Sequence, residues 1–91
     1  MIMTRQEHLE QQEQHLTDES ARDARTLQQL TRNVDKRYTS GTRDRIVAVA
    51  LRLHDHRTEL ASVRRELKQR AAAVDAVRRE LNQRAAAALL D

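Results

Sequence analysis

The sequence predicts an all-α protein, a single domain formed by a two-helix antiparallel hairpin whose long second helix has a heptad pattern. Three observations lead to this prediction. Pro is absent from the 91 residues and Gly occurs only once. Ala, Leu, Arg, Glu and Gln dominate, as in coiled coils and long helices. Tyr38 is the only aromatic residue, and a thin packing of Leu, Val and Ala needs no aromatic core.

The first helix is expected over residues 4–38. Thr4 and Glu7 have the spacing of a capping box, in which both side chains accept hydrogen bonds from free N–H groups of the first turn. The apolar stripe of this helix is weak because three polar residues interrupt it: Glu13, Ser20 and Asp23. We therefore expect residues 1–20 to fray unless a partner covers them. The hairpin core is expected at the other end of the helix, at Leu27, Leu30, Val34 and Tyr38.

A turn is expected at residues 39–42, where hydroxyl residues surround the single glycine. Gly41 is suited to the left-handed conformation that ends a helix, and Thr42 is suited to cap the next one. The second helix is then expected over residues 43–90.

The second helix has an uninterrupted heptad frame. Every a position is apolar: Ile46, Leu53, Leu60, Leu67, Val74, Leu81 and Ala88. The d positions alternate Val with polar residues: Val49, His56, Val63, Arg70, Val77, Arg84 and Asp91. The segment 63–73 recurs almost unchanged at 77–87, so two heptads form one repeat, which is typical of a rod. Glu66 and Glu80 each precede an arginine by four residues, the favoured order for an ion pair within a helix.

The residue pattern disfavours several classes of function. His54 and His56 point to different sides of a helix and there is no Cys, so no metal site or other cofactor is expected. No nucleophile stands beside a base and no glycine-rich loop is present, so neither an enzyme nor a small-molecule substrate is expected. No segment is apolar enough for a bilayer, and the start lacks a signal-peptide pattern, so we expect a cytoplasmic protein without membrane contact. Protonation of His56 at its d position would weaken packing, but a partly exposed histidine with no role is the preferred interpretation.

The preferred hypothesis is a coiled-coil structural or adaptor protein that self-associates or packs on another helical protein. Its interface is predicted at nine apolar residues: Ile46, Val49, Leu53, Leu60, Val63, Leu67, Val74, Val77 and Leu81. The alternative is a dimeric nucleic-acid-binding accessory protein. It would grip phosphates with the basic side chains of the second helix: Arg57, Arg64, Arg65, Lys68, Arg78 and Arg79. The pattern leaves open two, three or four chains, in parallel or antiparallel order.

Overall fold

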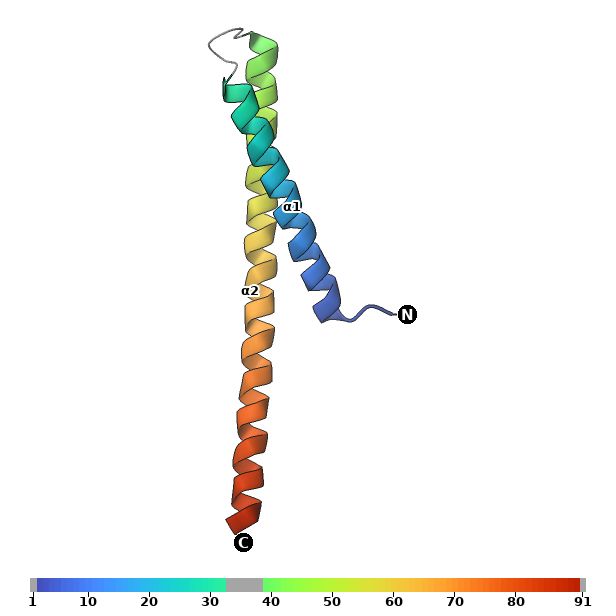
Figure 1. Ribbon diagram of the computed structural model, residues 1–91, viewed down its shortest axis with the longest axis vertical. Coiled ribbons are helices and arrows are strands. Elements are labelled where there is room, and N and C mark those ends of the chain that lie inside the picture. Colours follow the sequence, from blue (N-terminus) through green and yellow to red (C-terminus); the bar gives the residue numbers. More distant parts are fainter. Residues whose placement is uncertain (1, 33–38, 91) are drawn as a thin grey trace.

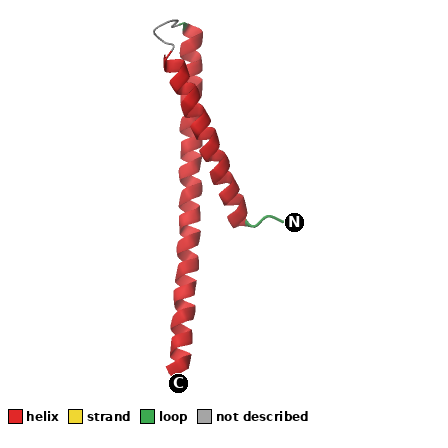
Figure 2. Ribbon diagram, in the orientation of Figure 1, coloured by secondary structure: helices red, strands yellow, loops and turns green. Residues whose placement is uncertain are grey.

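The computed structural model describes residues 2–32 and 39–90. It consists of two helices, α1 (Arg5–Arg32) and α2 (Ser40–Leu90), which run antiparallel side by side (Figures 1 and 2). The predicted all-α hairpin is therefore confirmed. The molecule is a rod whose principal dimensions are 79 × 29 × 14 Å. At about 1.5 Å per residue, the 51 residues of α2 account for the longest of these dimensions.

The start of α1 agrees with the sequence prediction. The Thr4 hydroxyl accepts a hydrogen bond of 3.1 Å from the backbone N–H of Glu7, and the Thr4 carbonyl accepts one of 3.0 Å from that of His8. Thr4 is thus the N-cap, and the helix begins at the next residue. At the other end, the predicted core residues Val34 and Tyr38 lie outside the described residues.

The predicted turn at Gly41 is wrong. α2 begins at Ser40, and Gly41 lies in its first turn without a positive φ. The cap is Thr39, whose hydroxyl accepts a hydrogen bond of 3.2 Å from the N–H of Thr42, while its carbonyl accepts one from Arg43. The hydroxyl of Thr39 can already satisfy the free N–H groups of a first turn. The helix therefore begins three residues earlier than predicted.

Two rows of side chains join the helices. On α1, the residues at one heptad position are buried or half-buried: Leu9, Leu16, Asp23 and Leu30. On α2, the buried a and d residues are Val49, Leu53, Leu60 and Val63, with Ile46, His56 and Leu67 half-buried. We call this contact between α1 and the a and d rows of α2 the hairpin seam. Its largest apolar cluster consists of Leu9, Leu16, Leu60 and Val63, with Leu67 packed against it.

The hairpin seam changes two interpretations of the sequence. Leu9 and Leu16 are the most buried leucines of α1, although they lie within the residues that were expected to fray. The expected core residues Leu27 and Leu30 are only half-buried. Six of the nine predicted interface residues, from Ile46 to Leu67, are buried or half-buried within the chain. The reason is that α1 has enough apolar residues at heptad spacing to cover this part of α2.

Candidate interaction surface

The last part of α2 has no neighbouring helix in the chain. α1 begins beside Glu66, to which Arg5 is bound, and every residue from 71 to 90 is exposed. We call residues 71–90 the overhang; at 1.5 Å per residue it is about 30 Å long. In Figure 1 it is the orange and red segment that extends beyond α1. The chain therefore leaves a long helical surface for another molecule to contact.

The overhang continues the rows that α1 covers elsewhere. Val74, Val77 and Leu81 occupy a and d positions, yet they are 56%, 57% and 58% exposed. In the hairpin seam the equivalent residues Leu60 and Val63 are 7% exposed. The same pattern is thus buried along one half of α2 and open along the other.

Small side chains flank the open row. Alanines occupy four of the neighbouring e and g positions of the overhang: Ala71, Ala73, Ala85 and Ala87. At these four positions no long side chain holds another helix away, whereas Arg78 and Glu80 occupy the remaining e and g positions between them. Leu89 and Leu90, each 88% exposed, add apolar surface at the end of α2.

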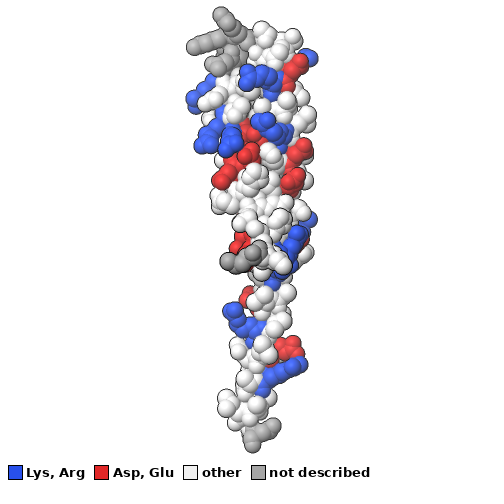
Figure 3. Space-filling view, turned by 90° about the vertical axis from the view of Figure 1, so that its right-hand side faces the viewer, with Lys and Arg blue, Asp and Glu red and all other residues white. Residues whose placement is uncertain are grey.

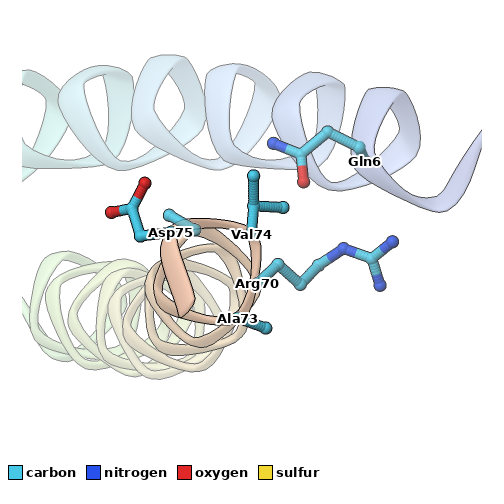
Figure 4. A pocket seen from close by; sticks show the side chains of 6 residues that line it. Gln6, Arg70, Ala73, Val74 and Asp75 are labelled. Atoms are coloured by element: carbon cyan, nitrogen blue, oxygen red, sulfur yellow. The ribbon is translucent and has the colours of Figure 1, made fainter. Parts of the chain in front are cut away.

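A groove marks the place where the hairpin seam opens. It is lined by Gln6 of α1 and, on α2, by Arg70, Ala71, Ala73, Val74 and Asp75. Figure 4 shows Val74 pointing toward α1, with Gln6 over the same space and Arg70 extending away from it. Val74, the first residue in an a position that α1 does not cover, therefore forms the floor of the groove.

Of the two ion pairs that the repeat predicts within α2, one forms and the other is replaced by a pair with α1. Arg84 binds Glu80 within the overhang at 2.7 Å, as the spacing predicts. Glu66 instead forms a two-bond pair with Arg5 of α1, at 2.9 and 3.0 Å. Hydrogen bonds from Arg5 lower the pKa of Glu66 more than partial burial raises it, with Arg70 adding a smaller attraction. The first glutamate of the repeat thus joins the two helices, and the second stays local.

A buried polar cluster crosses the middle of the hairpin seam. The carboxylate of Asp23 is 1% exposed; Arg52 donates to its Oδ1 at 2.9 Å and His56 Nδ1 lies 2.7 Å from its Oδ2. An ionised carboxylate only accepts hydrogen bonds, so Nδ1 of His56 carries the proton. Burial raises the pKa of Asp23, but the hydrogen bonds and charges of Arg52 and His56 outweigh it and leave the pKa below its ordinary value of 3.8.

This cluster gives His56 a partner across the hairpin seam. Its Nδ1 lies 2.7 Å from Oδ2 of Asp23, so this polar d residue contacts α1 directly. Sequence reasoning noted both residues as interruptions of the apolar rows but did not pair them. The hairpin brings them together: Asp23, nine residues before the end of α1, lies beside His56, sixteen residues after the start of α2.

The cluster resembles only part of a catalytic site. A carboxylate that orients an imidazole through Nδ1 is found in hydrolytic triads, and Ser20 lies one turn before Asp23 on α1. However, the Ser20 hydroxyl is buried and makes no hydrogen bond to a described residue. The cluster lines neither the groove at Val74 nor a smaller depression beside Arg5 and Glu66. The described residues include no group of three or more His, Asp or Glu placed to hold a metal ion. The arrangement is suited to joining helices.

The predicted nucleic-acid contacts are exposed, and two of them already interact with groups within the chain. Arg64 lies 3.5 Å from Glu13 of α1, and Arg79 donates to the Asp75 carbonyl within its own helix. On the face shown in Figure 3, Lys and Arg atoms alternate with Asp and Glu atoms along the rod. The potential along this face is therefore mixed in sign.

Comparison with known protein families, curated proteins and solved structures finds no match to this chain. Within the described residues, neither helix has a stretch of the length and hydropathy needed to cross a membrane. The functional argument therefore rests on the surface of the overhang and the chemistry of the hairpin seam.

Proposed function

We propose that this chain is a non-enzymatic helical adaptor in which the hairpin is the base and the overhang binds another α-helix. The bound helix comes from a second copy or from a different helical protein. The observation that carries the proposal is the change along α2, from a and d residues buried by α1 to equivalent residues that are more than half exposed. Helices with heptad-spaced apolar residues bury them by packing against a partner helix.

The size of the open row indicates reversible binding. Full burial of a Val or Leu side chain contributes about 1.5–3 kcal/mol, and about half of that remains for Val74, Val77 and Leu81. If a partner helix offers three similar residues, the total is about 5–9 kcal/mol, which is comparable to the cost of association, about 4–15 kcal/mol. Burial of the open row alone therefore supports weak association, in keeping with an adaptor that binds and releases its partner.

The test is site-specific photo-cross-linking in the cells that naturally make the chain. A cross-linking amino acid replaces Val77, which lies in the open row, or Ala72, which lies on the opposite side of the same helix. The proposal predicts a defined protein adduct at position 77 and none at position 72. The mass of the adduct distinguishes a second copy from another protein. Equal, diffuse labelling at both positions would remove the support for the adaptor function.

A second candidate function is nucleic-acid binding by the basic side chains of α2. It is favoured by four exposed cations that form no ion pair with another described residue: Arg57, Arg65, Lys68 and Arg78. Phosphate binding of this kind weakens steeply with salt and is similar on unrelated sequences. Fluorescence anisotropy with two unrelated duplexes at low and physiological salt tests it, with an Arg65→Gln/Lys68→Gln variant expected to bind less tightly. Absence of binding at low salt would eliminate this candidate.

A further inference from the structure

We infer that the helix bound by the overhang is that of a second copy, packed antiparallel so that each overhang completes the hairpin seam of the other copy. This inference rests on the proposed function, since it names the partner of the same surface. It follows from three features: where α1 begins, which residues interrupt the d row, and where the groove lies.

The length of the overhang fits a second copy. An antiparallel α2 runs in the same direction as α1 and lies on the same face of the first copy. When Val77 of one chain faces Leu81 of the other, position 90 of the second copy lies level with position 68 of the first. The bound helix then ends where α1 begins, since Arg5 is held at Glu66. Its residues 84–88 then lie level with residues 74–70 of the first copy, along the groove beside Gln6 (Figure 4).

The polar d residues favour the antiparallel order. In an antiparallel pair each a residue faces a d residue, so Arg84 meets Val74 of the other copy and Arg70 meets Ala88. Each arginine thus faces a smaller side chain and can keep its charged end at the edge, where Arg84 already binds Glu80 at 2.7 Å. A parallel pair in register would instead place Arg70 against Arg70 and Arg84 against Arg84. Like charges in one layer oppose that arrangement.

α1 also selects the register among the antiparallel choices. A shift of one heptad toward the connection would place the end of the second copy beside residue 61. Leu9 and Leu16 of α1 already occupy the hairpin seam there, next to Leu60 and Val63. A shift of one heptad in the other direction would leave Val74 facing only the end of the second chain. The register that pairs Val77 with Leu81 therefore covers the open row without displacing α1.

Disulfide trapping tests this arrangement without background, because the natural chain contains no Cys. Purified full-length Val77→Cys and Leu81→Cys variants, one carrying a small tag, are mixed and oxidised gently. The matched control is a mixture of Ala72→Cys and Ala86→Cys, which lie at the same level of the proposed pair but on the outer face of both helices. We expect the mixed disulfide in the first pair at about tenfold or more above the control, because bridged Cα atoms must approach within about 7 Å.

Two outcomes would overturn the inference. Efficient cross-linking of Val77→Cys to itself would show a parallel pair in register. No cross-linking, together with a monomeric mass by light scattering at the highest soluble concentration, would show that a second copy does not occupy the overhang. In that case photo-cross-linking at position 77 in the natural cells still decides the adaptor function: an adduct with a different protein would retain it, and its absence would not.

Discussion

The buried carboxylate of Asp23 leads to a prediction about the stability of the hairpin. Removing the partners of the carboxylate should destabilise the hairpin, whereas removing the carboxylate itself should not. The double substitution Arg52→Ala/His56→Ala removes both partners and leaves the carboxylate buried in the hairpin seam. The single substitution Asp23→Leu removes the charge itself and extends the row of Leu9 and Leu16 on α1. We expect the first change to unfold the hairpin and the second to preserve or stabilise it.

The magnitudes follow from burial. Stranding a buried charge typically costs about 3–5 kcal/mol, whereas Asp23→Leu strands no buried charge, because the side chain of Arg52 is 55% exposed and can reach solvent. For the same reason, solvent screens the attraction of Arg52 to Asp23. We therefore expect the loss of stability to lie at the low end of the range for a stranded charge. Native proteins have about 5–15 kcal/mol of stability in total, and a chain with so few buried side chains should lie at the low end of that range. The double variant should therefore lose most of its stability.

Urea unfolding followed by far-ultraviolet circular dichroism, at neutral pH, measures these differences. The matched control is Arg52→Ala/His56→Ala in the Asp23→Leu background, where no carboxylate remains to be stranded and the further loss should be small. If Asp23→Leu were as destabilising as the double variant, the reasoning would be refuted. The net attraction of the ion pair, and not the stranded charge, would then determine stability.

Three further predictions concern stability at low pH, the position of Gly41 in the first turn of α2, and the difference between a buried leucine and an exposed one. Asp23 and Glu66 both have pKa values below their ordinary values, 3.8 and 4.5, so their contribution to stability is present at neutral pH. It is lost as the pH falls below these ordinary values and through the lowered ones, which thermal unfolding between pH 6 and pH 2 would show. Gly41→Ala should stabilise the chain by about 0.5–1 kcal/mol, since an added Cβ meets only the Thr39 hydroxyl at 3.7 Å; a loss of thermal stability would contradict the position of Gly41 inside α2. Leu16→Ala should cost about 2–5 kcal/mol, whereas Leu81→Ala should leave the unfolding of the monomer nearly unchanged; equal losses in urea unfolding would contradict the difference in burial.

The hairpin, and the face of α2 that packs against α1, could be predicted from the sequence because both depend on the periodicity of apolar residues. The absence of Pro, the single Gly and the a row of α2 are sufficient to predict two helices. The same row is the one that packs against α1 from Ile46 to Leu67. Thr4 could be predicted as a cap because its hydroxyl and the spacing to Glu7 are local features.

What the sequence did not reveal depends on contacts between distant residues. Asp23 was interpreted as an interruption of the weak apolar stripe of α1, but Arg52 and His56 satisfy that carboxylate from the other helix. Gly41 was interpreted as a break from its intrinsic propensity, yet the cap of Thr39 lets α2 include it. The division of the nine interface residues into a covered and an open group depends on where α1 begins, which no single window of the sequence gives.

The central claim, that the overhang is an interaction surface, is tested most directly by light scattering of the full-length chain across concentration, at low and high salt. Leu81→Glu changes the open row, and Ala86→Glu is the matched change on the outer face of the overhang. The structure predicts a mass that rises toward twice that of the monomer with concentration in the natural chain and in Ala86→Glu, in both salts, but not in Leu81→Glu. A mass that is the same for all three proteins at every concentration would contradict self-association through this surface.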